Sequence, residues 1–145
     1  MLEKNIEFIK QVIEQNIPIH KFLGLKLLVL EKGIVRVSVP FRDEVIGDFR
    51  RNRWHGGIIA TIMDSVGGIV GGTYFKSFED KLVTIDLRID YLKGAEASSI
   101  IVEGKIVRFG NRILVTKMKA FQNNELIAEG KGVYNFFPID NSMEK

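Results

Sequence analysis

The run from Gly56 to Tyr74 limits what this chain can fold into more than any other stretch, because its only charged side chain is that of Asp64. Every other residue of the run is apolar, Gly, Ser or Thr. A helix that is apolar on all sides has to be covered by other parts of the fold, and a lone carboxylate inside it is costly unless it is hydrogen-bonded, paired or used. The sequence therefore predicts a buried central helix over about residues 56–75, in which Asp64 either bonds a neighbouring group or takes part in chemistry.

A membrane span is one alternative for this run, which is long enough to cross a bilayer. Asp64 near the middle argues against it, since a carboxylate there costs about 2.5–3.5 kcal/mol to insert. The six glycines are poor helix formers and leave a strand-like run as another alternative. The i, i+4 spacing of Gly67-Gly68 and Gly71-Gly72 instead favours a smooth helix face against which another group packs closely. We expect a core helix and no membrane span.

Hydrophobic spacing on either side of the run predicts one more helix and six strands. The amphipathic helix covers about residues 3–15 and ends before Pro18, and its apolar residues step by four, three and four: Leu2, Ile6, Ile9 and Ile13. Alternating or β-branched apolar patterns predict the strands 25–30, 33–40, 82–92, 98–108, 113–121 and 125–137. We expect a polar, basic loop over 41–54, bulges at Gly130 and Gly132, and a polar tail from residue 138.

This order of elements indicates the α+β class. Runs of strands joined by short turns form antiparallel sheets, and the apolar helix has to be covered by such a sheet. A curled antiparallel sheet wrapped around a long central helix satisfies both requirements. A chain of 145 residues is long enough for one domain with a real core, so we expect a single domain over residues 1–145 with its core at about 20–137.

Composition excludes several kinds of chemistry. The chain has no cysteine, which rules out disulfides, a thiolate nucleophile and Cys-based zinc sites, and its two histidines lie 35 positions apart, so we expect no metal. Residues 1–15 carry charges rather than the pattern of a signal peptide, so we expect a cytoplasmic protein. The net charge of +3 favours an anionic ligand but is too small to indicate nucleic-acid binding.

Three segments carry a resemblance to a known family: Arg53-Trp54-His55-Gly56-Gly57 through Asp64, Thr84 through Leu92, and Gly130 through Tyr134. With this order of strands and helices, the chain resembles the hotdog-fold acyl-CoA thioesterases of the phenylacetate-pathway and 4-hydroxybenzoyl-CoA thioesterase type. The resemblance covers about residues 20–137. It implies a thioester hydrolase of acyl-CoA metabolism that needs no cofactor, since coenzyme A is part of the substrate.

The resemblance also implies roles for individual residues. Asp64 corresponds to the general base or nucleophile, and the backbone N–H of Gly57 to the donor that polarises the thioester carbonyl. His55 corresponds to a supporting residue, and Thr84 to a residue that holds the attacking water. Family members usually carry Ile-Gly-Asn in the loop before the His, where this chain has Ile46-Gly47-Asp48; Asp48 is therefore a candidate in place of the usual Asn.

The chemistry follows from these residue types as well. Thioester hydrolysis needs a base or nucleophile and a donor that stabilises the developing oxyanion. Asp64 can supply the first, and the N–H groups at the start of a helix that opens with His-Gly-Gly can supply the second. Gly57 and Asp64 are seven residues apart, which is about 10.5 Å along one helix. They cannot both reach one carbonyl, whose reacting groups must lie within about 3–3.5 Å.

A site that uses both groups must therefore take them from two chains. Two central helices packed antiparallel about a two-fold axis would place Gly57 opposite Asp64 of the partner, with the axis near the small residues Ala60 and Thr61. The sequence thus predicts a homodimer with two shared sites, and a dimer of dimers remains an alternative. Thr84, Asp86, Arg88 and Asp90 also fit an ordinary solvated strand.

Substrate contacts are less sharply defined. The acyl group is expected beside Gly56 and against Trp54, Met63 and Val66. Phosphates of coenzyme A require basic groups at the mouth of the site, and the candidates are Arg50, Arg51, Arg53, Lys93, Arg108 and Arg112. We expect an acyl-CoA as the partner and no nucleic acid.

Two other functions fit the same fold. A dehydratase or hydratase acting on acyl-CoA or acyl-carrier protein pairs a His with an Asp or Glu, and only His20 and His55 are available here. A non-catalytic acyl-CoA-binding domain would keep the helix start but would have no need of Asp64.

Overall fold

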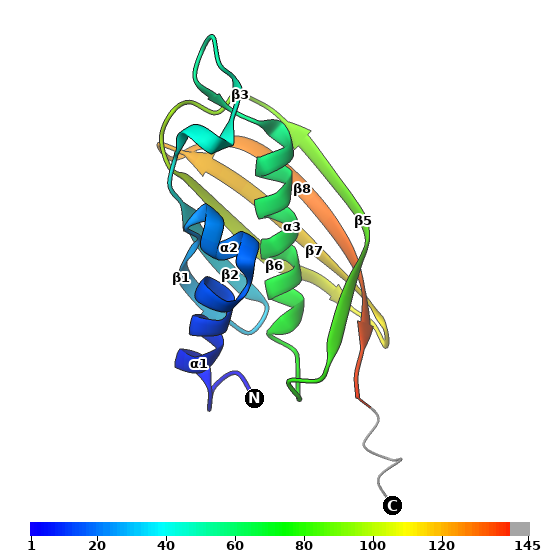
Figure 1. Ribbon diagram of the computed structural model, residues 1–145. Helices are drawn as coiled ribbons and strands as arrows, with labels where there is room; N and C mark the ends of the chain where they lie inside the picture. The colour runs from blue at the N-terminus through cyan, green and yellow to red at the C-terminus, as the bar shows by residue number, and fades with distance from the viewer. Residues whose placement is uncertain (140–145) are drawn as a thin grey trace, which may run out of the picture.

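A computed structural model of the chain describes residues 1–139. Six antiparallel strands form one sheet in the order β1-β2-β6-β7-β8-β5, and the long helix α3 (Gly56–Gly72) lies against one face of it (Figure 1). The strands of this sheet are β1 (Lys26–Glu31), β2 (Ile34–Val39), β5 (Lys81–Tyr91), β6 (Ile100–Phe109), β7 (Ile113–Gln122) and β8 (Glu125–Phe137). The predicted α+β class, with an antiparallel sheet curled around a central helix, is confirmed.

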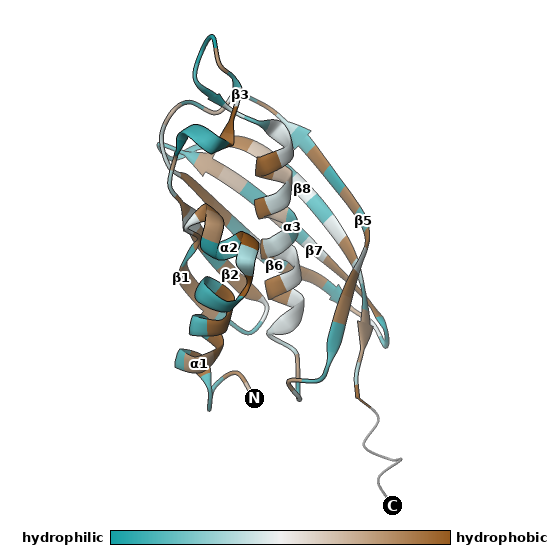
Figure 2. Cartoon of the chain, in the orientation of Figure 1, coloured by the Kyte–Doolittle hydropathy of each residue, from teal (hydrophilic) through white to brown (hydrophobic). Residues whose placement is uncertain are grey.

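The core lies between α3 and the sheet. The buried side chains of α3 include Ile62, Met63, Val66 and Val70, all with 0% exposure. Figure 2 shows α3 coloured brown or nearly white along most of its length, in contrast to the teal patches of the surrounding strands. Within residues 1–139, no helix is long and apolar enough to cross a membrane.

The paired glycines of α3 face two different environments. A Cβ added at Gly67 would overlap the Tyr134 hydroxyl, and one added at Gly71 would come within 2.7 Å of Leu82. Among residues 1–139, a Cβ at Gly68 or Gly72 would meet no atom within 4 Å beyond the neighbouring backbone of its own helix. The expected close packing therefore holds for Gly67 and Gly71, while Gly68 and Gly72 border open space.

The N-terminal region is not the single helix that the sequence pattern predicts. It comprises α1 (Ile6–Gln11), a π-helical turn η1 (Val12–Asn16) and a second short helix α2 (Pro18–Leu23). The predicted end before Pro18 is correct, but the prediction missed α2. Proline suits the first position of a helix because its N–H would be unpaired there in any case. Pro18 therefore ends one helix and begins the next, with extended Ile17 between them.

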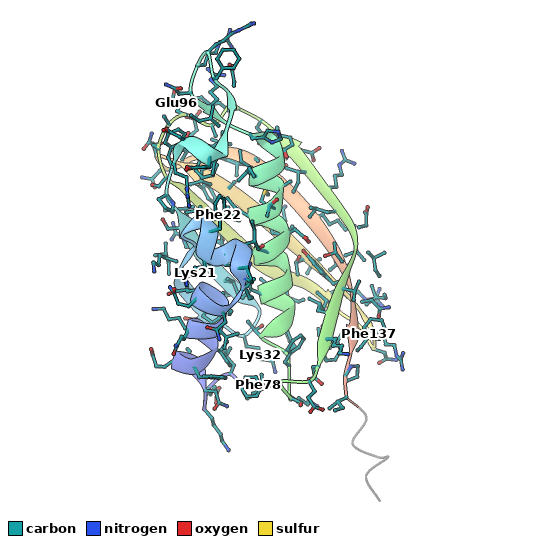
Figure 3. The ribbon with its side chains drawn as sticks, in the orientation of Figure 1. Lys21, Phe22, Lys32, Phe78, Glu96 and Phe137 are labelled. Atoms are coloured by element: carbon teal, nitrogen blue, oxygen red, sulfur yellow. The ribbon has the colours of Figure 1, made fainter. Side chains whose placement is uncertain are left out.

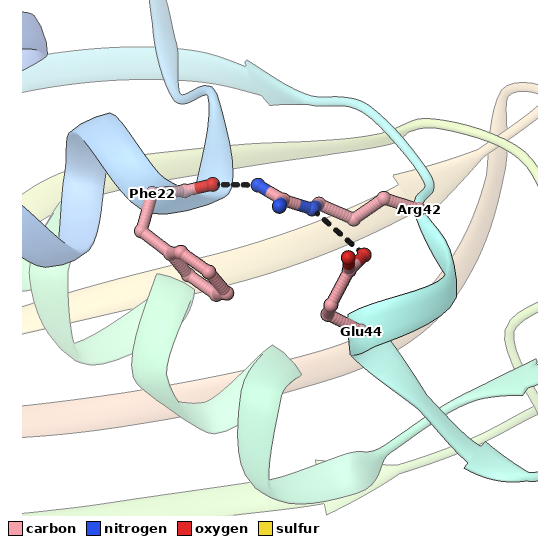
Figure 4. Close-up of polar contacts among 3 residues, drawn as sticks. All are labelled: Phe22, Arg42 and Glu44. Atoms are coloured by element: carbon pink, nitrogen blue, oxygen red, sulfur yellow. Dashed lines mark hydrogen bonds and ion pairs between the residues drawn. The ribbon is translucent and has the colours of Figure 1, made fainter.

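The predicted loop over 41–54 contains short regular elements. A 3₁₀ turn η2 (Asp43–Val45) leads into a small hairpin of β3 (Ile46–Asp48) and β4 (Arg53–Trp54). Arg42 ties this segment to α2, since its guanidinium donates to the carbonyl of Phe22 and pairs with Glu44 at 3.1 Å (Figure 4). These bonds hold the chain that enters α3 at His55.

The expected bulges at Gly130 and Gly132 are not found. Both residues pair regularly with β5 and β7, and the register shift in this region lies in β5, between Thr84 and Asp86. Glycine is needed at the two β8 positions for room rather than for a bulge. A Cβ at Gly132 would come within 2.5 Å of the Tyr134 ring, and one at Gly130 within 2.6 Å of Ile89.

The two environments of the α3 glycines predict opposite effects of one substitution. Gly67→Ala should destabilise the fold by about 1–3 kcal/mol, because the added methyl group overlaps Tyr134. Gly68→Ala should stabilise it by about 0.5–1 kcal/mol, because Ala is the better helix former and the methyl group enters open space. Urea unfolding of the two variants beside the parent measures both effects. Equal stabilities would show that the two glycine faces are not distinct.

Candidate active site

Asp64 is the centre of a hydrogen-bonded group formed by α3, β5 and β8. Its Oδ1 accepts from Thr84 Oγ1 at 3.0 Å and from the Tyr134 hydroxyl at 3.1 Å. Thr84 and Tyr134 are directly opposite each other in the β5–β8 register, so the sheet presents two hydroxyls to one carboxylate oxygen. Oδ2 is the oxygen that these bonds leave for a water or a substrate. The half-buried Asp64 thus combines a fixed orientation with access from outside.

Tyr134 is a site residue that the sequence analysis did not identify. Its side chain is 1% exposed, and its hydroxyl also lies 3.0 Å from the backbone carbonyl of Asp64. Burial, and then the nearby Asp64 carboxylate, raise the pKa of Tyr134 well above its usual value, so the phenol stays protonated and donates. The available signal was strand alternation, which places Tyr134 on the helix-facing side of β8, where a buried phenol needs a partner.

His55 and Gly57 form a second group at the N-terminus of α3. His55 is the N-cap residue, and its Nδ1 accepts the Gly57 N–H at 2.8 Å. A neutral ring that accepts through Nδ1 carries its proton on Nε2. Both residues are exposed, and Gly47 packs against the His55 backbone, where a Cβ would come within 2.7 Å of His55 Cα. The Gly57 N–H therefore faces solvent but is bonded to its own cap.

The two groups do not meet within one chain. Gly57 and Asp64 both belong to α3, and the seven residues between them correspond to about 10.5 Å along its axis. Thr84 lies beside Asp64 and not beside Gly57. The structure thus brings Asp64, Thr84 and Tyr134 together and leaves His55 and Gly57 about two helical turns away.

Asp48 is placed in the β3–β4 turn. Its Oδ1 accepts the backbone N–H of Arg50 at 3.1 Å, and Asp48 pairs with Arg53 in the small hairpin. This is the bonding of a turn-forming Asp. Within one chain, Asp48 makes no contact with the Asp64 group that would support the water-positioning role.

The side chains expected to contact the acyl group are buried in the single chain. Met63 and Val66 are fully buried between α3 and the sheet, and Trp54 is 5% exposed with its Nε1 donating to the Ser98 carbonyl at 3.0 Å. In one chain, a substrate cannot reach Met63 or Val66 without displacing the core, whereas Trp54 and Gly56 line a small surface pocket beside Tyr91. The helical repeat of about 100° per residue turns Met63 into the core, while its neighbour Asp64 lies beside the strands β8 and β5 at one edge of the sheet. The open cavity borders Ser65, Gly68 and Gly72 instead.

The basic candidates are spread over both ends of the molecule. Arg53 packs on Gly94, and its neighbours Arg50 and Arg51 lie in the β3–β4 turn near the start of α3. Arg108 and Arg112 flank the β6–β7 turn at the opposite end, where Phe109 stacks on Tyr74 beyond the C-terminus of α3. Lys93 pairs with Glu125 at 2.7 Å, and this bond raises the pKa of Lys93. One chain therefore does not gather these charges around a single site.

Among residues 1–139, no group of three or more His, Cys, Asp or Glu side chains is arranged to hold a metal ion. The candidate site consists of the Asp64 carboxylate, the Thr84 and Tyr134 hydroxyls and the N-terminus of α3.

Residues 52–128 match the family model described as the Thioesterase superfamily. This match spans the helix with Asp64 and most of the sheet, more than half of the chain. The chain belongs to the thioesterase superfamily, and the expected hotdog fold and the enzyme class, a thioester hydrolase, are confirmed.

Individual relatives agree with this membership. A putative esterase of Saccharolobus solfataricus is 30% identical over 118 residues, covering 81% of each chain. The medium/long-chain acyl-CoA thioesterase YigI of Salmonella typhimurium is 26% identical, covering 91% of this chain and 94% of that protein. A crystal structure of a Shewanella oneidensis protein related to the thioesterase superfamily is 28% identical, with a TM-score of 0.81 over 92% of this chain and 95% of that one.

The two hydroxyls on Asp64 should contribute unequally to catalysis. Tyr134→Phe removes a buried donor to a carboxylate, a bond worth about 1.5–3 kcal/mol, and should lower kcat by about ten-fold or more. Thr84→Val removes an exposed donor and should lower kcat by a smaller factor. Steady-state hydrolysis of an acyl-CoA by folded variants measures the difference. Parent-like turnover of Thr84→Val would make Thr84 an ordinary strand residue.

Proposed function

We propose that this protein is an acyl-CoA thioesterase that hydrolyses the thioester at a site shared by two copies of the chain. The observation that carries this proposal is the half-exposed Asp64 carboxylate, whose Oδ1 is fixed by Thr84 and Tyr134. A carboxylate that serves only the fold has no need of an open cavity in front of it, and Asp64 borders one. The name of the relative YigI supports an acyl-CoA as the substrate.

Asp64 supplies the first half of the reaction. Its free oxygen either takes a proton from the water that attacks the thioester carbon or attacks that carbon itself. The C–S bond then breaks, and coenzyme A leaves as the thiolate, which takes up the proton that water loses. Where Asp64 is the nucleophile, the acyl group is left on its oxygen as an anhydride, and water hydrolyses this anhydride to the free acid and restores the carboxylate. Tyr134 and Thr84 keep the carboxylate oriented through both steps.

A second chain supplies the oxyanion donor. The Gly57 N–H of the partner copy meets the carbonyl oxygen once the exposed His55 ring, which accepts that N–H in the isolated chain, moves aside. The argument for two chains is the separation of about 10.5 Å between Gly57 and Asp64 on one helix.

The edge strand β5 supports pairing of two copies. β5 is eleven residues long, lies at the edge of the sheet and bonds only β8 among the described strands. It exposes Val83 and Ile85, each at 55%. Long edge strands with exposed apolar residues readily pair with another chain. A second β5 would extend the sheet and bring the partially exposed residues of α3, including Ala60 and Thr61, towards their counterparts.

The rival functions have weaker support. A dehydratase would require a catalytic His near Asp64, but His20 is 5% exposed and its Nδ1 lies 2.9 Å from the Ile13 carbonyl. This bond gives His20 a role in joining the N-terminal helices. A non-catalytic binding domain would have no need of a carboxylate at this place in an apolar helix.

Replacement of Asp64 tests the catalytic proposal directly. Asp64→Asn keeps the volume but removes the charge and the base, and should lower hydrolysis by about 10²–10⁴-fold while the protein stays folded. The assay follows release of coenzyme A from an acyl-CoA with a thiol reagent, and cooperative unfolding serves as the control for folding. A folded Asp64→Asn protein that retains full activity would exclude Asp64 as the catalytic group.

Complementation tests whether the site is shared. The second variant is Gly57→Pro, which deletes the donor N–H in the first turn of α3, where Pro is best tolerated. A Cβ added at this position meets the exposed His55 ring. Asp64→Asn and Gly57→Pro are unfolded and refolded together so that mixed dimers form. Each mixed dimer then contains one intact site and one site with both defects. About half of the dimers are mixed under random pairing, so activity should return to about a quarter of the parent value.

A site within one chain predicts a different result. Every site would then keep one defect, and the mixture would be no more active than the separate variants. That outcome, with mixed dimers demonstrated by differently tagged chains, would reject the shared site without affecting the role of Asp64.

A further inference from the structure

A cavity of about 500 Å³ lies between α3, the N-terminal helices and the start of β5. Its volume falls within the range of about 300–1,000 Å³ that is typical of small-molecule sites. Asp64 and Thr84 border it, and most of the remaining lining is apolar, with Ile9 and Ile13 opposite Ile69. The proposed catalytic carboxylate therefore faces an apolar space that is large enough for part of a substrate.

The outer wall of this cavity is bonded to the rest of the fold. Glu14 Oε1 accepts the backbone N–H of Leu27 at 2.9 Å, which ties η1 to β1. The rings of Phe8 and Phe78 meet edge to face with their centres 5.5 Å apart, and they join α1 to the segment after α3. Figure 3 labels Phe78 at the end of the molecule where α3 finishes. The N-terminal helices thus form a built wall rather than a loose flap.

Two polar residues in the lining, Asp80 and His20, have partners within the protein. The Asp80 carboxylate accepts backbone N–H groups of Lys76, Ser77 and Ile139 at 2.8–3.1 Å. His20 Nδ1 is bonded to the Ile13 carbonyl. An apolar ligand therefore leaves these bonds intact.

Gly68 and Gly72 border this cavity, and sheet packing does not explain them. The sheet leaves no space for a Cβ at Gly67 or Gly71, whereas a Cβ at Gly68 or Gly72 contacts no other part of the described chain within 4 Å. Glycine inside a helix is destabilising relative to alanine. Gly68 and Gly72 keep the cavity open and lower the stability of the helix. A ligand that fills the cavity would account for glycine at both positions.

We propose that this cavity takes the aliphatic tail of the acyl group, and that Gly68 and Gly72 set the longest tail that the enzyme accepts. The proposal rests on the thioesterase function proposed above. Asp64 and Gly72 are eight residues apart, or about 12 Å along α3. An extended residue, which has three backbone bonds, spans about 3.3–3.6 Å. The distance of about 12 Å between Asp64 and Gly72 therefore corresponds to about ten bonds of an extended acyl chain. The substrate class is then an acyl-CoA with a straight chain of medium length.

Leucine substitutions at the two glycines test this proposal. The values of kcat/KM are measured on the whole chain with butyryl-, hexanoyl-, octanoyl-, decanoyl- and dodecanoyl-CoA. Each methylene kept out of the cavity should cost about four-fold in kcat/KM. Gly72→Leu should therefore lower the dodecanoyl-to-butyryl ratio by at least about ten-fold. Gly68→Leu should move the cut-off about five carbons shorter, because it lies about 6 Å nearer to Asp64.

Gly68→Ala and Gly72→Ala are the matched controls. They change the same helix positions but fill the space of only one methyl group, so they should shift the ratio much less than leucine does. Val12→Phe narrows the cavity from the opposite wall and should lower the dodecanoyl-to-butyryl ratio of kcat/KM as well. This variant tests the proposal even where a leucine variant does not fold.

The outcomes separate this inference from the proposed function. Folded leucine and Val12→Phe variants that hydrolyse acyl-CoA with the chain-length profile of the parent would overturn the inference alone. A parent protein that hydrolyses none of the substrates would overturn the proposed function. In that case, titration calorimetry with decanoyl-CoA tests the cavity, since Gly68→Leu should weaken binding to the Asp64→Asn protein. Equal binding would overturn the inference as well.

Discussion

Burial of α3 against the curled sheet is the interaction on which the rest of this structure depends. The helix brings its apolar side chains to the sheet and has glycine where the two approach most closely. At Gly67 this approach lets the Tyr134 hydroxyl reach the carbonyl and the carboxylate of Asp64. The same packing that forms the core therefore positions the polar site, and a single added methyl group at Gly67 would disturb both.

The carboxylate of Asp64 is acceptable in an apolar helix because the fold satisfies it in part. Two hydroxyls from paired positions of β5 and β8 bond one oxygen, and the Asp64 side chain borders the cavity. Complete burial would have required a cation or further donors. The result is a carboxylate with a defined orientation and an open side, which is the combination that proton transfer to or from a bound water requires.

The single chain contains both halves of the proposed catalytic site but holds them apart. A helix is rigid, so the distance between Gly57 and Asp64 is set by its rise per residue and cannot be closed by a loop movement. The exposed edge of β5 and the partially exposed residues of α3 are the surfaces through which a second copy would bring the halves together. The proposed dimer thus follows from the fixed distance between Gly57 and Asp64 on one helix.

The sequence by itself determined the α+β class, the central helix, the six sheet strands and the candidate Asp64, because hydrophobic period and the cost of a lone carboxylate are local properties of the chain. It did not determine which face of α3 meets the sheet. That choice turned Met63 and Val66 into the core, exposed Gly68 and Gly72 to the cavity, and brought Tyr134, 70 residues away in the chain, to Asp64. Only tertiary packing decides such pairings, since they depend on how strands far apart in sequence align beside the helix.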